Sequence, residues 1–450
     1  MKPLSLSFFV LTFCFWSVSC SAGTAVAEHP QEEPPENLLQ AGPMLGYSEM
    51  REVMLWVQTS KEAEVKIAYW EHKSGVKHFT ETVHTQKETG FTAHLIADEL
   101  EPGRQYDYQL YINDKPLRLP YDCTFQTQTL WQWRTDPPEF SFAVGSCAYI
   151  NEEVYDRPGN SYGGDYHIFS SIDRDRPDFM LWLGDNVYYR EVDWFARSSM
   201  IKRYTHTRSL AEMQPLLAHT HHYAIWDDHD YGPNDSDRSF IHKARAREIF
   251  SLFWANPSYG LDGQHGITTF FQWADVDFFL LDDRYFRSPN TCQTCDCTIL
   301  GEEQLNWLIE ALSSSRASFK MIAIGGQVLT TEKNYETYIN LCPQERERLL
   351  ARIAEEGIEN VIFLTGDRHF TELSVYTNEV GHKVYDLTVS PLTSGHATNQ
   401  GQINLLRVPG TAVFERNYAI LSLSGPRKAR KLSIQVKNSD GKLLWEKVIE

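Results

Sequence analysis

The chain has 450 residues, of which 42% are hydrophobic and 13% aromatic, so it is long enough for two or three folded domains and is not a disordered protein. Its formal net charge of -18 argues against a nucleic-acid-binding surface, because binding to a polyanion depends on Lys and Arg side chains that neutralise phosphates. A phosphate compound that binds here must therefore be attracted by local cations.

Residues 1–27 have the layout of a secretory signal peptide: a charge at Lys2, an apolar stretch and a final run of small residues. We therefore expect an exported protein of the periplasm or cell surface. An alternative is a lipoprotein signal that ends at Cys20, and a lipid anchor there would be the protein's attachment to the membrane. Residues 28–39 are rich in Pro and Glu and predict a linker. No later segment has about 18 consecutive apolar residues, so we predict no transmembrane helix.

Residues 40–132 alternate between apolar and polar side chains, as half-buried strands do. The expected strands include 53–57, 63–69 and 92–95. A turn at 100–105 leads into a further strand that starts at Tyr106, as in the tyrosine corner of β-sandwiches. This pattern predicts an all-β, fibronectin type III-like domain, whose ordinary role is packing and presentation rather than ligand binding.

From residue 138 to residue 450, strands alternate with helical patterns, which is typical of an α/β catalytic domain. Apolar residues recur with helical spacing in about 14 residues after Gly301 and again over 344–356. Further helices are expected within 195–219 and 243–255. The chain ends in a predicted hairpin formed by 431–436 and 443–448.

Six short apolar runs in this domain each end at a polar cluster. They are typical of buried strands and lie at 140–144, 179–183, 223–226, 278–281, 321–324 and 361–365. Four of the clusters carry metal-ligating residue types, namely Gly145-Ser146-Cys147, Gly184-Asp185-Asn186-Val187-Tyr188, Asp227-Asp228-His229-Asp230 and Gly366-Asp367-Arg368-His369. Because ligands collect where the strands of an open α/β sheet end, we expect one metal site at one sheet edge.

The Gly-Asp-x-x-Tyr cluster is the most specific of the four. Asp185 can bridge two cations, and Tyr188 can reach one of them as a phenolate. A phenolate forms near neutral pH only on a strong Lewis acid, since the reference pKa of Tyr is about 10, and this indicates a trivalent metal such as Fe(III). Cys147 would be a second anionic ligand of that ion. In the last cluster, Asp367 suits a hard divalent ion and His369 suits the iron.

Asp228 adds a carboxylate on the divalent side, which leaves His229 to act on a leaving group or to hold a substrate oxygen. Taken singly, these residues also fit structural roles, such as a hydrogen-bonded core Tyr or an Asp that caps a helix. Four clusters at successive strand ends favour the metal site. The alternatives stay open for Asn186, Asp230, Asn234 and Asp235, which either bind a divalent ion or shape the loop, and the loop role is favoured for Asn234 and Asp235. Three histidines that precede a strand are expected to be structural: His219, His221 and His222.

Six cysteines lie outside the signal region, and in an exported protein disulfides are the first expectation. Cys292, Cys295 and Cys297 also suggest a metal knot, but no fourth ligand is spaced nearby as a zinc ribbon needs. We therefore predict one or two loop disulfides, whose pairing is open among Cys123, Cys292, Cys295, Cys297 and Cys342. If Cys147 binds a metal, at least one other thiol stays free.

Together the clusters resemble the PhoD-like alkaline phosphatase and phosphodiesterase family, a branch of the metallophosphoesterase superfamily related to purple acid phosphatases. The segments Leu281-Asp282-Asp283-Arg284-Tyr285-Phe286-Arg287 and Leu300-Gly301-Glu302-Glu303-Gln304-Leu305-Asn306-Trp307-Leu308 are also similar. The resemblance covers about residues 40–450. It implies an α/β (α+β) sandwich of mixed sheets flanked by helices, preceded by the fibronectin type III-like domain.

The resemblance also implies a set of ligands. Fe(III) would be bound by Cys147, Asp185, Tyr188 and His369, with Asp185 shared between ions. Asp228 and Asp367 would hold one or two divalent ions, which the family suggests are calcium. The middle ligand that other branches take from a Val-x-x-His motif has no counterpart here, since Gly326-Gln327 occupies that strand end.

The reaction implied is hydrolysis of a small phosphate ester, either a monoester or a diester, by metal-activated water. His229 would assist the departing alkoxide. Arg368 and Arg284 would either contact the phosphoryl group or form ion pairs with the neighbouring Asp residues. An alternative from another class is a surface-anchored, calcium-stabilised adhesin or glycan-binding protein without hydrolase activity, and a visible charge-transfer band from Fe(III) would distinguish the two.

Overall fold

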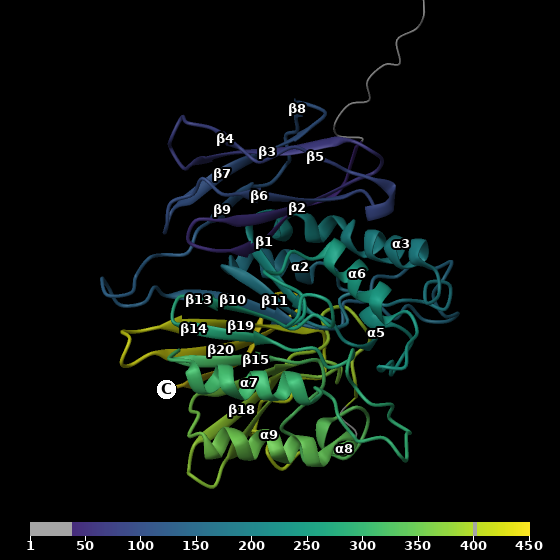
Figure 1. Cartoon of the computed structure of the whole chain (residues 1–450), viewed down its shortest axis with the longest axis vertical. Helices are drawn as coiled ribbons and strands as arrows, with labels where there is room; N and C mark the ends of the chain where they lie inside the picture. The colour runs from purple at the N-terminus through teal and green to yellow at the C-terminus, as the bar shows by residue number, and fades with distance from the viewer. Residues whose placement is uncertain (1–37, 399–402) are drawn as a thin grey trace, which may run out of the picture. The chain divides into compact units, whose positions relative to one another are not determined.

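The computed structural model in Figure 1 describes residues 38–398 and 403–450. The predicted signal peptide, Cys20 and residues 28–37 of the predicted linker lie outside the described residues. Within the described residues, no helix is long and apolar enough to cross a membrane.

The N-terminal strands enclose an apolar core. A six-stranded sheet on one side consists of β3 (Glu64–Glu71), β4 (His78–Phe79), β5 (Val83–His84), β7 (Gln105–Ile112), β8 (Lys115–Pro116) and β9 (Thr124–Gln126). On the other side lie β1 (Leu39–Ser48), β2 (Val53–Thr59) and β6 (Thr92–Ala97), and the short 3-10 helix η1 (Lys87–Thr89) precedes β6. Buried and partly exposed residues alternate along β7, as the sequence predicts. The Tyr106 hydroxyl accepts a hydrogen bond from the backbone N–H of Glu101 at 2.8 Å, which confirms the predicted tyrosine corner.

Strand β1 has no counterpart among the predicted strands, and it joins the N-terminal strands to the rest of the chain. It pairs in parallel with β12 (His221–Ile225), with Leu45 opposite His221. One nine-stranded sheet therefore runs in the order β21-β20-β19-β10-β11-β12-β1-β2-β6. Its other members are β10 (Phe140–Gly145), β11 (Phe179–Leu183), β19 (Asn417–Ser424), β20 (Lys431–Asn438) and β21 (Leu443–Ile449).

A second mixed sheet, of six strands, packs against the nine-stranded sheet. Its order is β13 (Thr269–Trp273), β14 (Val276–Leu280), β15 (Phe319–Ala323), β16 (Val361–Thr365), β18 (Lys383–Thr388) and β17 (Glu372–Thr377). All six predicted buried strands are present, and the predicted C-terminal hairpin is β20 and β21. The expectation of a single sheet edge is wrong, because β10, β11 and β12 belong to one sheet while β14, β15 and β16 belong to the other.

Helices cover the outer faces of the two sheets. Figure 1 shows α7 (Glu302–Ser314) and α9 (Pro343–Glu355) beside each other, and both pack on the six-stranded sheet through residues such as Leu308 and Ile353. The helices α2 (Ile168–Asp175), α4 (Gln214–His219) and α6 (Lys243–Phe253) pack against the nine-stranded sheet. The remaining helical segments are α3 (Arg197–Arg208), η2 (Ala211–Met213), α5 (Asp228–Tyr231) and α8 (Tyr338–Leu341). The helices predicted after Gly301 and over 344–356, 195–219 and 243–255 are confirmed.

Aromatic rings fill the space between the sheets, and Phe179 lies at their centre. Its ring is 4.8 Å from that of Phe142, 4.9 Å from Trp273 and 5.3 Å from Phe278. Phe179→Ala is expected to lower the free energy of unfolding by about 3–5 kcal/mol, since the removal of a buried ring leaves a cavity that a packed core refills only in part. Chemical denaturation measures this, with Phe270→Ala, at a 41% exposed ring, as the control. Equal losses in the two variants would contradict the packing described here.

The cysteines form two disulfides, as predicted. Cys292 is bonded to Cys295, and Cys297 is bonded to Cys342. Cys123 and Cys147 are free thiols, and Cys147 is buried. The Cys297–Cys342 bond ties the loop after β14 to the start of α9.

Candidate metal centre

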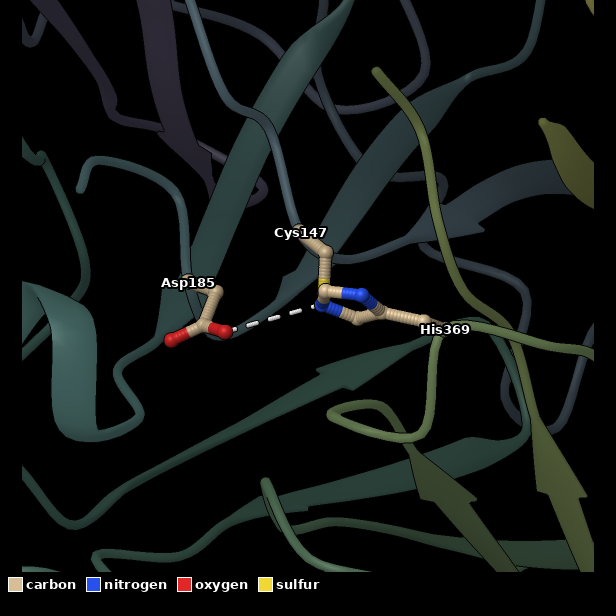
Figure 2. A group of neighbouring side chains, drawn as sticks. All are labelled: Cys147, Asp185 and His369. Carbon is tan, nitrogen blue, oxygen red and sulfur yellow. Dashed lines mark hydrogen bonds between the residues drawn. The ribbon is translucent and has the colours of Figure 1, made fainter. Parts of the chain in front are cut away.

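Side chains from the ends of β10, β11 and β16 meet at one point between the two sheets. Cys147 follows β10, Asp185 follows β11, and His369 follows β16. Their ligand atoms all lie within 4.8 Å of one another, and the three side chains face each other in Figure 2. The Cys147 thiol donates to Asp185 Oδ2 across 3.6 Å. Strands from both sheets therefore contribute to a single cluster.

The backbone at these positions is strained. Cys147, Asp185, Asp367 and His369 have φ angles of 61°, 53°, 63° and 57°, a region that non-glycine residues adopt only at a cost. Residues held in this conformation gather at functional sites, because the surrounding structure has to impose it. The side chains of Cys147, Asp185 and His369 face one another in this conformation.

Tyr188 joins the same cluster. Its hydroxyl donates to Asp185 Oδ2 at 3.1 Å and lies 3.4 Å from His369 Nε2. Burial, together with the negative charges of Asp185 and Cys147, raises the pKa of Tyr188 well above its usual value. The ring of His229 lies 4.2 Å from the ring of Tyr188.

The acidic groups of the cluster are costly to ionise in the absence of a cation. Burial raises the pKa of the Cys147 thiol to about 11. Burial and then the charge of Asp228 raise the pKa of Asp185 well above the normal range. A trivalent cation would offset the cost of ionising the buried thiol, phenol and carboxyl group, and the imidazole would be a further ligand. These residues therefore fit Fe(III).

Two more groups of side chains continue from Asp185. Asp185, Asp228 and His229 form one, and Asp228, Asp235 and Glu336 form the other, each with ligand atoms within 4.8 Å of one another. Burial raises the pKa of Asp228, but His229 and Arg284 outweigh it and hold the pKa below its usual value. These oxygen-rich groups fit a hard divalent ion such as calcium. Asp228 belongs to both of these groups. Asp185 likewise belongs to two groups, the one with Cys147 and His369 and the one with Asp228 and His229.

Glu336 is a site residue that the sequence analysis did not identify, and Asp235 was favoured there as a loop residue. The backbone N–H of Asp235 donates to Asp228 Oδ2 at 2.7 Å, which does order the loop, while its carboxylate also belongs to the third group. Glu336 lies in an irregular loop well past the end of β15, so no strand-end motif marks it. The only sequence signal is an acidic residue in a segment without regular structure.

The structure does not place Asp367 in any of the three groups found among the described residues. Burial and the charge of Glu336 raise the pKa of the Asp367 carboxyl group to about 6, so Asp367 lies near the divalent side.

Asn186 donates from Nδ2 to the backbone oxygen of Ile225 at 2.8 Å, and its Oδ1 is buried without a partner in the described part of the chain. An orphaned buried oxygen beside carboxylates is a candidate cation ligand. Asp230 instead accepts N–H groups from Asn186 and Asp227, and it braces the loop.

Both candidate phosphoryl contacts, Arg284 and Arg368, are held by carboxylates. Arg284 is fully buried and bonds to Asp227 and Glu336. Arg368 lies 3.5 Å from Glu332, and it donates to Asn334 Oδ1 at 3.2 Å. This placement favours the ion-pair role for both. The histidines expected to be structural are buried or paired: His221 contacts Gly46, His222 accepts from Trp182, and His219 contacts Asp173.

Comparison with known proteins connects this geometry to a family. A model described as PhoD-like phosphatase matches residues 142–424. The chain belongs to the PhoD-like phosphatase family. A second model, described as a domain of unknown function (DUF7800), matches residues 36–130. The resemblance inferred from the strand-end clusters is thereby confirmed.

A curated relative of the PhoD-like chain is alkaline phosphatase D of Bacillus subtilis (strain 168), which is 22% identical over 360 residues. The match covers 68% of this chain and 58% of the length of that relative. Among solved structures, one titled as the structure of PhoD has a TM-score of 0.72 at 17% identity and covers 92% of each chain. The purple acid phosphatase PPD1 from yellow lupin (Lupinus luteus) seeds has a TM-score of 0.66 at 13% identity, over 91% of this chain and 74% of that one. At these identities the structures confirm the expected fold class.

Proposed function

We propose that this protein is an exported, metal-dependent hydrolase of small phosphate esters, with Fe(III) and one or two divalent ions, calcium, as cofactors. Membership of the phosphatase family supports the hydrolase class. The observation that carries the proposal is the convergence of a thiol, a phenol, an imidazole and two carboxylates at Cys147, Tyr188, His369, Asp185 and Asp228. The two disulfides support export, since such bonds persist in oxidising compartments.

In this proposal Cys147, Asp185, Tyr188 and His369 would hold the iron, and Asp185, Asp228, Asp235 and Glu336 would hold divalent ions, with Asp367 close by. When bound, the ions would neutralise the phosphoryl oxygens and lower the pKa of a water nucleophile. The protein itself holds these ligands in fixed positions. It also keeps the guanidinium groups of Arg284 and Arg368 in ion pairs with carboxylates.

His229 is proposed to protonate the leaving alkoxide. Its side chain is 24% exposed and belongs both to the cluster and to the lining of the pocket beside it. Burial lowers the pKa of His229, and the charge of Asp228, whose Oδ2 lies 4.0 Å from Nε2, opposes that effect. The pKa stays below its usual value, so the carboxylate of Asp228 offsets only part of the cost of the protonated form that a general acid needs.

The proposal is tested by assaying the purified, metal-loaded protein on p-nitrophenyl phosphate and bis(p-nitrophenyl) phosphate, with metal content measured on the same sample. We expect hydrolysis of at least one ester, and the ratio of the two rates distinguishes a monoesterase from a diesterase. A folded protein that contains metal but hydrolyses neither ester would contradict the proposed function.

His369 has a partner that can set its orientation. The Tyr162 hydroxyl lies 3.1 Å from Nδ1 of His369, on the opposite side of the ring from Nε2, which faces Tyr188. Tyr162→Phe is expected to weaken iron binding by about 10- to 100-fold, as removal of such supporting hydrogen bonds does elsewhere. Titration with a competing chelator measures this. Tyr155→Phe, in the same loop but bonded to Lys202, is the control and should bind iron normally; equal affinities in both variants would exclude the role of Tyr162.

A further inference from the structure

A pocket of about 680 Å³ lies beside the candidate metal centre. Tyr188 and His229 line its inner end, so it is continuous with the cluster. The loop between β10 and α2 and the segment 188–194 form the rest of its wall. Pockets of roughly 300–1,000 Å³ hold complete small molecules, whereas a phosphoryl group needs far less room. The extra space is therefore available to the alcohol part of a phosphate ester.

The wall of this pocket is rich in aromatic rings. Besides Tyr188, it is lined by Tyr149, Tyr155, Tyr162 and Trp194. The rings of Tyr149 and Tyr162 meet edge to face at 4.9 Å, which fixes both beside the cluster. Val154, at the rim, is 84% exposed. Rigid aromatic surfaces of this kind favour planar, apolar partners, which stack or meet them edge to face.

The charges of the pocket do not favour a second phosphate. Among the described residues of its wall, the cationic side chains are Arg157 and Arg190, and there are three carboxylates. Arg190 bonds to Asp156 at 2.7 Å and lies over the Tyr149 ring at 3.9 Å. Arg157 lies 3.9 Å from Glu191, and Glu153 adds one more negative charge. Recognition of phosphate away from the metal ions would require a guanidinium or ammonium group that is not already beside a carboxylate.

We propose that this pocket is the alcohol subsite and that it selects phosphate esters whose alcohol is uncharged and carries an aromatic ring, over esters whose alcohol bears a further phosphate. The inference rests on the proposed hydrolase function. In this inference, Tyr155 and Trp194 in the pocket wall bind the aromatic ring of the alcohol. Glu153 and Glu191 repel the negative charge of a second phosphate.

The test uses three substrates that share a four-carbon chain at the ester oxygen and differ at its far end: n-butyl phosphate, 4-phenylbutyl phosphate and butane-1,4-diol bisphosphate, each as the monoester and as its methyl diester. We expect kcat/KM to rise about tenfold when the ring is added and to fall about tenfold when the second phosphate is added. Equal values for the three substrates, or a preference for the bisphosphate, would overturn the inference while leaving the hydrolase function intact. No hydrolysis of any of them would instead contradict the proposed function.

Two variants separate the parts of the inference. Tyr155→Ala should lower the ratio of kcat/KM for 4-phenylbutyl phosphate to kcat/KM for n-butyl phosphate by about tenfold, which removes most of the gain from the phenyl group. Glu153→Lys should raise the ratio of kcat/KM for the bisphosphate to kcat/KM for n-butyl phosphate by about tenfold. Trp133→Ala, at a 93% exposed side chain that does not line the pocket, is the control. If Tyr155→Ala and Glu153→Lys change all three substrates by the same factor, the pocket does not select the alcohol.

Discussion

Asp185→Asn is expected to lower kcat/KM for phosphate ester hydrolysis by roughly a thousandfold without unfolding the protein. Asp185 is the residue common to the iron-side group with Cys147 and His369 and to the divalent-side group with Asp228 and His229. Its loss would therefore weaken both sides of the centre at once. Loss of any other ligand in these two groups affects one side directly.

The stability of the metal-free protein should not fall in this variant. Burial and like charges raise the pKa of Asp185 in the folded protein. A carboxyl group whose folded-state pKa is raised binds its proton more tightly in the folded than in the unfolded chain, so at neutral pH its ionised form costs stability. Asn has the same shape and no charge, and it removes that cost.

Activity, metal content and thermal unfolding of Asp185→Asn, measured on the same preparation, test both statements. Asp114→Asn is the matched control, because Asp114 is a 73% exposed carboxylate paired with Lys66 in the N-terminal sheet. The control should keep full activity. Near-normal turnover in Asp185→Asn would contradict the proposed centre with two kinds of ion.

The strand-end clusters could be predicted because each is a local motif. A strand buried on both faces is a continuous apolar run, and it must end where the first charged residues appear, as at Leu183 and Thr365. The residues that follow such runs, Asp185 and His369 among them, are then placed at strand ends by the fold itself. Helices α7 and α9 were predictable for the same reason, since one face of each repeats at helical spacing.

Which strands pair could not be derived in that way. The apolar run 278–281 has the same character as 179–183, but its strand, β14, lies in the other sheet. Pairing depends on contacts between residues far apart in the chain, and β1, whose neighbour β12 lies more than 170 positions later, shows this most clearly. The alternation of side chains along one strand does not specify its partner.

Glu336 was missed for a related reason. Its position depends on Arg284 and Arg287, which bond to its carboxylate from the loop after β14. A residue held by long-range ion pairs in an irregular loop has no periodic signal around it. The same ion pairs explain why Arg284 is unavailable to a substrate. Its place in the sequence, beside paired Asp residues, suggested either a contact with the phosphoryl group or an ion pair.

We expect the iron-loaded protein to have a visible absorption band and Tyr188→Phe to remove it. A phenolate bound to Fe(III) gives a charge-transfer band, and a phenylalanine ring gives none. The ring itself should remain in place, because it packs 4.2 Å from His229 and 5.1 Å from Tyr149. The substitution removes the hydroxyl's contacts with Asp185, His369 and the Cys147 thiol.

Tyr149→Phe is the control for the band, because Tyr149 packs on Tyr188 while its own hydroxyl donates to Asp156. It should leave the spectrum unchanged. A band that persists in Tyr188→Phe but disappears in Cys147→Ser would assign the absorption to the thiolate instead. Cys147 lies 3.6 Å from Asp185 in the same buried cluster, so it can contribute its own transition. A protein that binds iron and shows no band in any form would exclude both anions as ligands, and the raised pKa values of Tyr188 and Cys147 would then describe a neutral phenol and thiol.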